Sequence, residues 1–151
     1  MRHRLGGRYG LWGFLLAVGA IAGLLGGSQP GAAGTSLYEA LGGKDGLTRL
    51  ATAMLDIASK DPRTHDQFGN VSFEWLTPRL AAYFCMRVGG PCKYPGRDLH
   101  AAHEGLHVSV GEFNAVVEDL QIAMDRQGIP FWTQNRFLAL LAPTEHDIVG
   151  R

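Results

Sequence analysis

The sequence predicts an all-α fold, and three observations support this prediction. Apolar residues recur at intervals of three and four along the long segments, which places them on one face of a helix. A serine–glutamate capping box, glycines and prolines mark the ends of these segments. No segment alternates apolar and polar residues between hairpin turns, as an amphipathic strand would. A chain of 151 residues is long enough for one domain with one buried core.

The first long predicted helix ends just before Asp61-Pro62. Its apolar positions follow helical spacing: Leu47, Leu50, Ala51, Met54, Leu55 and Ala58. The residue before a proline avoids the helical backbone conformation, so Asp61 ends this helix. We therefore expect these six residues to lie on one face that packs into the core.

A second helical segment is interrupted by Pro78. Its apolar positions are Phe73, Leu76, Leu80, Tyr83 and Phe84. In one alternative the helix starts at Thr77, with Pro78 in its first turn. In the other it starts near Ser72 and kinks at Pro78. The sequence does not choose between the two.

Two further helices are predicted in the last third of the chain. Ser109 and Glu112 form a capping box at the start of the first, and Gly128 ends it. Its apolar stripe comprises Val110, Phe113, Val117, Leu120 and Met124. Pro130 suits the first turn of the last helix. The residues expected to face inward in that helix are Phe137, Leu138, Leu140 and Leu141.

Residues 1–34 have the composition of a leader rather than of a folded domain. They carry three basic residues and no acidic one: Arg2, Arg4 and Arg8. A run of 15 apolar or glycine residues, Leu11 to Leu25, follows. This pattern predicts a secretory signal peptide, because the run is shorter than the ~20 residues that span a bilayer. The alternative is an uncleaved membrane anchor. In both cases residues 35–151 form the globular domain, and we expect it to be exported.

The charge of the globular domain argues against one class of partner. Without the three leader arginines, it carries 11 Lys and Arg against 14 Asp and Glu, a net charge of −3. A mildly acidic domain lacks the basic surface that nucleic-acid binding needs. A membrane partner is expected only where the leader stays uncleaved.

Several short motifs occur in a fixed order along the globular domain. The segment from Tyr94 to His103 reads Tyr-Pro-Gly-Arg-Asp-Leu-His-Ala-Ala-His. The other motifs are Leu37-Tyr38-Glu-x-Leu-Gly42-Gly43, Asp61-Pro62-Arg63, Phe68, Gly89-Gly90-Pro91, Phe113-Asn-x-Val-Val-Glu118-Asp-Leu120 and Leu140-Leu-Ala-Pro143. The ordered set covers about residues 36–149 and resembles the group I truncated haemoglobins. This resemblance implies a two-over-two helical sandwich that binds b-type haem.

Three histidines are candidates for the iron ligand that the resemblance implies. His100, His103 and His107 would share one face of an unbroken helix, and such a set could also bind zinc. Gly105 argues against an unbroken helix, because glycine commonly ends one. The family motif assigns the axial ligand of the haem iron to His103. His100 and His107 are interpreted as residues at the rim of the pocket, with the haem propionates within their reach.

The distal side of the pocket departs from the family pattern. Family spacing places a distal tyrosine at Leu55 and two often polar positions at Leu76 and Leu80. All three are leucines here, so the usual hydrogen-bond donor to bound dioxygen is missing. The alternative is that this register is wrong by one turn and that Tyr83 points its hydroxyl inward.

Other apolar residues are candidates for the pocket wall. Phe68 matches a family phenylalanine that packs on the porphyrin. The further candidates are Leu99, Val110, Phe113, Val117 and Leu141. Each would also be an ordinary core residue in any helical protein.

The resemblance implies reversible binding of dioxygen, carbon monoxide and nitric oxide. The alternatives are a haem redox enzyme, either a nitric oxide dioxygenase or a nitrite reductase, and a gas sensor. An unidentified electron donor or reductase would keep the iron in its ferrous state. The sequence does not identify the physiological ligand.

The chain contains two cysteines, Cys85 and Cys92, on either side of a Gly-Gly-Pro turn. An exported protein meets an oxidising compartment, where disulfides form and persist. We therefore expect a disulfide across this turn. The pair is too far along the chain from His103 to suggest a thiolate ligand for haem.

Overall fold

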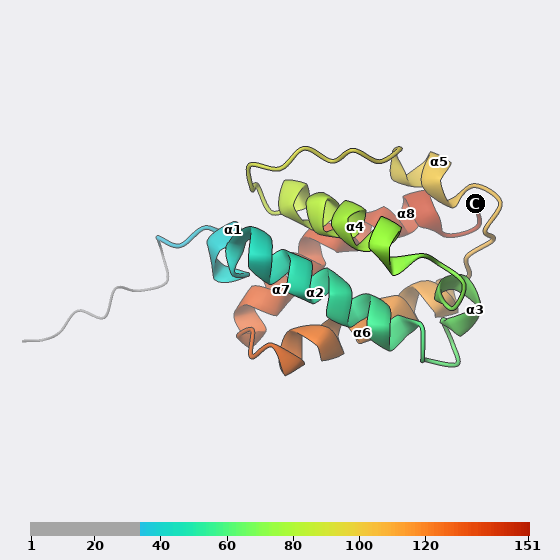
Figure 1. The fold of residues 1–151 in the computed structure, drawn as a ribbon, viewed down its shortest axis with the longest axis horizontal. Helices are drawn as coiled ribbons and strands as arrows, with labels where there is room; N and C mark the ends of the chain where they lie inside the picture. Colours follow the sequence, from blue (N-terminus) through green and yellow to red (C-terminus); the bar gives the residue numbers. More distant parts are fainter. Residues whose placement is uncertain (1–33) are drawn as a thin grey trace, which may run out of the picture. The chain divides into compact units, whose positions relative to one another are not determined.

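The computed structural model describes residues 34–151, and this part is entirely helical and irregular, with no strand (Figure 1). Its helices are α1 (Leu37–Ala40), α2 (Gly43–Ala58), α3 (His65–Phe68), α4 (Phe73–Arg87), α5 (Leu99–His103), α6 (Val110–Arg126), α7 (Phe131–Leu141), the 3₁₀ turn η1 (Ala142–Thr144) and α8 (Glu145–Ile148). The all-α prediction is confirmed for these residues. The predicted leader lies, apart from Gly34, outside the described residues. Within residues 34–151, no helix has the length and apolar character to cross a membrane.

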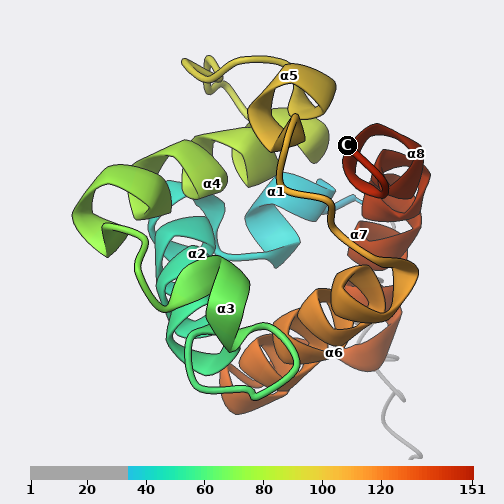
Figure 2. The same ribbon diagram turned by 90° about the vertical axis from the view of Figure 1, so that its right-hand side faces the viewer.

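The long helices form two pairs around a common centre. Helix α2 packs against both α4 and α6, and α6 also contacts α7. Viewed from the end, α2 and α4 lie on one side, and α6 and α7 on the other (Figure 2). The short helix α5 lies beside α8. The two pairs of helices therefore form two layers.

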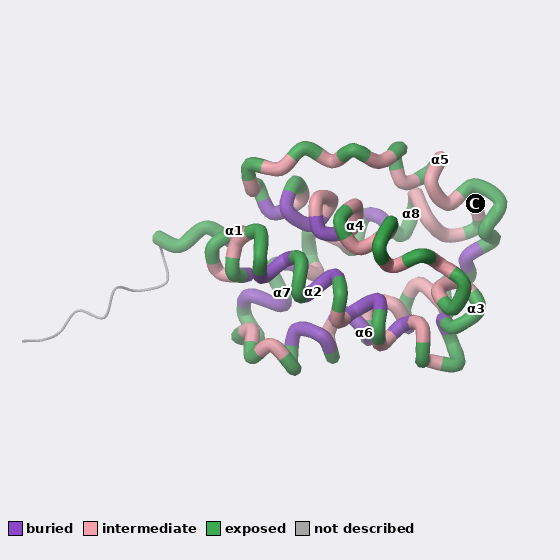
Figure 3. The backbone as a smooth tube through the Cα atoms, viewed as in Figure 1, coloured by how far each residue is buried: buried purple, intermediate pink, exposed green. Residues whose placement is uncertain are grey.

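Among the described helices, α2 contributes the largest share of the buried core between these layers. All six residues of its predicted stripe are buried: Leu47, Leu50, Ala51, Met54, Leu55 and Ala58 (Figure 3). Burying a leucine side chain contributes about 1.5–3 kcal/mol, so this stripe is a major source of stability. Phe84 and Phe137 meet edge to face across the core, with ring centroids 5.1 Å apart. This contact connects α4 to α7.

Helix α4 resolves the two alternatives for Pro78 in favour of the earlier start. The helix begins at Phe73, and the Ser72 side chain accepts a hydrogen bond from the Trp75 N–H at 3.3 Å. The helix therefore runs through Pro78. Arg79 Nη1 also donates to the Trp75 carbonyl at 2.8 Å, next to the point where proline removes a backbone donor.

The predicted ends of α6 are confirmed. Ser109 and Glu112 form the capping box at its start. Gly128 has a φ of +66°, and the Ile129 N–H returns to the Met124 carbonyl at 3.1 Å. This is a Schellman motif, in which glycine takes up the left-handed backbone conformation at the end of a helix.

For two residues, Val110 and Leu140, the prediction that they face the core is wrong. Val110 is 50% exposed, because it lies in the first turn of α6, before the helix reaches the core. Leu140 is 37% exposed. The inward face of α7 runs through Gln134, Phe137 and Leu141, and with 3.6 residues per turn this leaves Leu140 at its flank.

The short connection between α1 and α2 requires glycine. A Cβ atom at Gly46 would lie 2.0 Å from the Leu41 carbonyl oxygen, which no real side chain tolerates. Gly42 has a φ of +82° at the start of α2. Sequence analysis assigned no cap to α1, yet Ser36 and Glu39 form a second capping box there. This corner fixes the start of α2, the helix that positions Leu55.

Candidate functional site

The two helical layers enclose a mainly apolar cavity of about 580 Å³. Its walls come from helices α2 to α8, the 3₁₀ turn η1 and several of the segments between them. Of the residues predicted as the iron ligand, the distal leucines or the pocket wall, Val110 does not line it. The others do: Leu55, Phe68, Leu76, Leu80, Leu99, His103, Phe113, Val117 and Leu141. Because these residues are far apart in the sequence, the fold has brought the predicted pocket together.

His103 is half-buried at the end of α5 and lines this cavity. Asp98 caps the helix, with its side chain accepting from the Ala101 N–H at 3.0 Å. His103 Nδ1 lies 2.8 Å from the Leu99 carbonyl oxygen. A carbonyl oxygen can only accept, so Nδ1 carries the proton and Nε2 of the neutral ring keeps its lone pair. Metal-binding histidines are commonly oriented in this way.

The zinc alternative finds no support in the described residues. Helix α5 ends at His103, Gly105 has a φ of +80°, and His107 has a φ of +52°. The three histidines therefore do not share one helix. No group of three His, Cys, Asp or Glu side chains among residues 34–151 is arranged to hold a metal ion. His100 and His107 are exposed and do not line the cavity, so their place at the rim stays a prediction.

One wall of the cavity carries three leucines. Leu55 is fully buried in α2, while Leu76 and Leu80 are half-buried in α4. All three line the cavity, and none has a hydrogen-bond donor in its side chain. These three side chains therefore offer a ligand apolar contacts only.

Tyr83 lines the same cavity, so its hydroxyl is the alternative hydrogen-bond donor that the sequence left open. Its ring meets that of Tyr94 edge to face, with centroids 5.3 Å apart. Burial raises the pKa of the Tyr83 hydroxyl, which therefore stays protonated at neutral pH. Within residues 34–151, this hydroxyl forms no hydrogen bond with another protein group. A substitution at Tyr83 can therefore test whether it serves as a donor.

Several polar and aromatic residues of the cavity wall were not predicted from the sequence. Arg79 stacks over the Trp75 ring at 4.1 Å, and both residues line the cavity. Their spacing of four positions on α4 was a signal for this contact. Tyr94 and Arg97 also line the cavity. They belong to the motif from Tyr94 to His103, in which only Leu99 and the histidines were predicted to lie at the pocket.

Behind the cavity wall lies a buried carboxyl group, Asp119, which is 1% exposed. The Thr64 hydroxyl donates to the Ala58 carbonyl at 2.6 Å, and Asp119 Oδ2 lies 3.4 Å from the same hydroxyl. Asp119 Oδ1 has no partner in the described structure. Burial raises the pKa of Asp119, and the neighbouring Asp61 carboxylate raises it further. By contrast, hydrogen bonds from Arg63 lower the pKa of Asp61 to about 2.

We expect Asp119→Asn to stabilise the fold increasingly as pH rises. A carboxyl group whose pKa is raised by folding contributes fully below its unfolded pKa of about 4, and this contribution is lost as pH rises through the folded value. Asparagine has no charge to bury, so the stability of the variant does not fall with pH at this position. Urea unfolding of parent and variant at pH 4 and pH 7.5 measures the difference. An equal difference at both pH values would show that Asp119 does not titrate abnormally.

The fold thus combines two helical layers, an apolar cavity between them and one oriented histidine on the cavity wall. Residues 36–150 match the family model of the bacterial-like globins, and the chain belongs to this family. The resemblance to the group I truncated haemoglobins is confirmed by the relatives. A group 1 truncated haemoglobin of Tetrahymena pyriformis is 24% identical over 116 residues, which are 77% of this chain and 96% of that protein.

Solved structures show the same fold. The Fe(III) form of the Tetrahymena pyriformis truncated haemoglobin has a TM-score of 0.74 and 24% identity, with 78% of this chain and 100% of that chain covered. The 2/2 haemoglobin of Synechococcus sp. PCC 7002 has a TM-score of 0.70 and 22% identity, with the same coverage. Globins are haem proteins, so membership of this family implies haem-based gas binding.

Variants of the Tetrahymena pyriformis protein allow a comparison of spacing. Their crystal structures replace one tyrosine by phenylalanine and, separately, each of two glutamines by glutamate. The tyrosine precedes the two glutamines by 21 and 25 positions. Leu55 precedes Leu76 and Leu80 by the same two intervals. The spacing of the three leucines thus equals that of three polar residues in the relative.

Proposed function

We propose that the chain binds diatomic gases reversibly at a b-type haem, with His103 as the axial ligand. The observation that carries this proposal is the orientation of His103. Nδ1 donates its hydrogen bond to the Leu99 carbonyl, so the lone pair of Nε2 remains available to bind a metal ion. His103 lies on the wall of an apolar cavity. When bound, haem supplies the iron that binds the gas.

The remaining walls fit a flat apolar group with an acidic edge. Phe68, Phe113 and Val117 are half-buried, so each has surface that a bound group would cover. Arg79 and Arg97 line the same cavity and could pair with carboxylates of the haem. An apolar interior with basic side chains at the wall therefore matches the two chemistries of the haem molecule.

The leucine wall gives this proposal its specificity. A hydrogen-bond donor on the cavity wall would stabilise a gas that is bound with partial negative charge, such as dioxygen, far more than nearly neutral carbon monoxide. Leu55, Leu76 and Leu80 provide no such donor. We propose that dioxygen is bound without a distal hydrogen bond and that carbon monoxide is preferred. The same wall disfavours nitric oxide oxidation and similar redox roles, because these need a long-lived dioxygen complex.

Absorption spectroscopy of the full-length chain, loaded with haem and reduced, tests this proposal. We expect the spectrum to shift on addition of carbon monoxide, and to shift and return when dioxygen is added and removed. A spectrum indifferent to both gases would refute gas binding, even if haem is taken up.

We also propose that the globular domain is exported, with a signal peptide or anchor at residues 1–34. Support comes from the composition of those residues and from the bond between Cys85 and Cys92. The mass of the protein from its native compartment tests this proposal. A mature chain that begins between about Thr35 and Leu37 and carries an intact bridge is expected, whereas an intact N-terminus with two free thiols would contradict it.

A further inference from the structure

The segment between α4 and α5 forms part of the cavity wall without forming a helix. We call residues 91–97 the strap; it runs from the end of α4 towards α5 (Figure 1). Four of its seven residues line the cavity: Tyr94, Pro95, Gly96 and Arg97. The strap leads directly into Asp98, the residue that caps the helix of His103. Its position therefore affects both the wall and the candidate iron ligand.

The strap has few attachments to the rest of the fold. Helix α4 ends at Arg87, and the Gly90 N–H donates a hydrogen bond to the Cys85 carbonyl at 2.8 Å. After Gly90, residues 91–97 form no hydrogen bond with any described residue. Irregular backbone without hydrogen bonds has little to hold it in one conformation.

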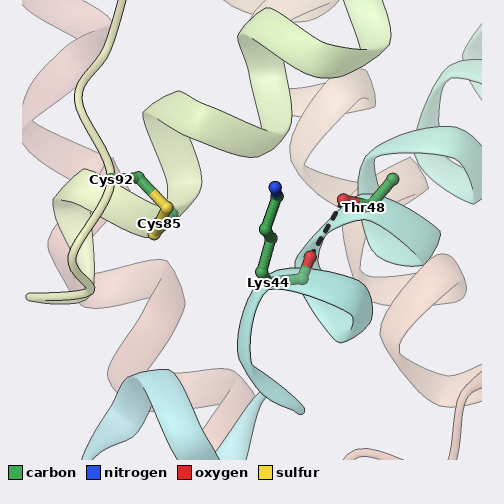
Figure 4. The surroundings of a disulfide bond; sticks show 4 residues. All are labelled: Lys44, Thr48, Cys85 and Cys92. Atoms are coloured by element: carbon green, nitrogen blue, oxygen red, sulfur yellow. Dashed lines mark hydrogen bonds between the residues drawn. A yellow bond between two sulfur atoms is a disulfide. The ribbon is translucent and has the colours of Figure 1, made fainter.

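Cys92 and Tyr94 attach the strap to the rest of the fold, and the attachment at Cys92 is covalent. Cys92 is bonded to Cys85, which is 1% exposed in α4, so the predicted disulfide is confirmed (Figure 4). Cys92 also packs against the hydrophobic core. Two residues later, the Tyr94 ring meets Tyr83 of α4 edge to face. The disulfide thus fixes the strap to α4 just before the residues that line the cavity.

We propose that the Cys85–Cys92 bridge positions the strap as the closing wall of the cavity and thereby retains the bound haem. This inference rests on the proposed haem binding. Without the bridge, the strap keeps one aromatic contact and no hydrogen bond, so it opens more often. Each opening removes Tyr94 and Arg97 from the wall and exposes the bound group to water. Oxidation of the cysteines therefore increases the residence time of the haem.

The full-length Cys85→Ala/Cys92→Ala variant tests this in two ways, the first of which needs no haem. Lys93 and Arg97 are exposed trypsin sites inside the strap, and Lys60 is an exposed reference site at the end of α2. We expect cleavage at the two strap sites to be at least about tenfold faster in the variant, with cleavage at Lys60 unchanged. Equal acceleration at all three sites would indicate general destabilisation and overturn the proposal.

The second measurement is the rate of haem transfer from each protein to excess apomyoglobin. The variant should release haem at least about tenfold faster than the oxidised parent. Leu47→Ala, a core variant away from the cavity, is the matched control for lost stability. Faster strap cleavage with unchanged haem release would overturn the role in retention. A parent that takes up no haem would instead refute the proposed function, while the cleavage pattern would still decide whether the bridge holds the strap.

Discussion

Replacing His103 by glycine should abolish stable haem binding in the absence of added ligand. The variant removes the only cavity-lining imidazole among the described residues. Free imidazole, which fits the space that the side chain leaves, should restore haem binding and the ferrous spectrum. Haem titration of the full-length variant, with and without imidazole, measures both effects. Rescue separates loss of an axial ligand from loss of folding.

The matched control for this variant is His100→Gly. His100 lies on the same short helix but is exposed and does not line the cavity. Its replacement should leave the haem affinity within about threefold of the parent value, since surface substitutions usually have small effects. If His100→Gly loses haem and His103→Gly does not, the assignment of the axial ligand is wrong.

Replacing Leu55 by tyrosine should slow dioxygen release and leave carbon monoxide release nearly unchanged. Leu55 lines the cavity, so a tyrosine there could project its hydroxyl towards a bound gas. A hydrogen bond to a partly charged ligand is worth about 1–3 kcal/mol, which corresponds to roughly 5- to 150-fold slower release. Stopped-flow measurement of both dissociation rates, in parent and variant, gives the ratio directly.

Tyr83→Phe is the control that distinguishes the two distal registers. If the leucines form the distal wall, this variant should release dioxygen at the rate of the parent, which we expect to be fast. A parent that already releases dioxygen slowly, together with faster release from Tyr83→Phe, would identify Tyr83 as the donor.

Much of the fold could be predicted from the sequence, because the helix faces repeat with a clear period. The stripe of α2 is fully buried, and the ends of α6 follow from Ser109, Glu112 and Gly128. The start of α4 could not be predicted, because local rules allow Pro78 in two positions and tertiary packing decides between them. Periodicity also fails at helix ends, as the exposure of Val110 shows.

The part of the site that could be predicted consists of residues that lie on periodic helices or in an ordered motif. The positions of Leu55 and Leu76 on the cavity wall, and that of His103, follow from such spacing. The strap has no period, so the part that Tyr94 and Arg97 play in the wall became visible only in three dimensions. The stacking of Arg79 on Trp75 was also missed, because neither residue belongs to the apolar stripe from which this helix was predicted.

The central claim is that this chain binds one haem through His103 in an apolar cavity. The most direct test is the absorption spectrum of the ferrous, ligand-free parent after titration with haem. The account predicts saturation at one haem per chain and the spectrum of five-coordinate, histidine-ligated iron. No saturable uptake would contradict it, as would a ferrous spectrum that is unchanged in His103→Gly.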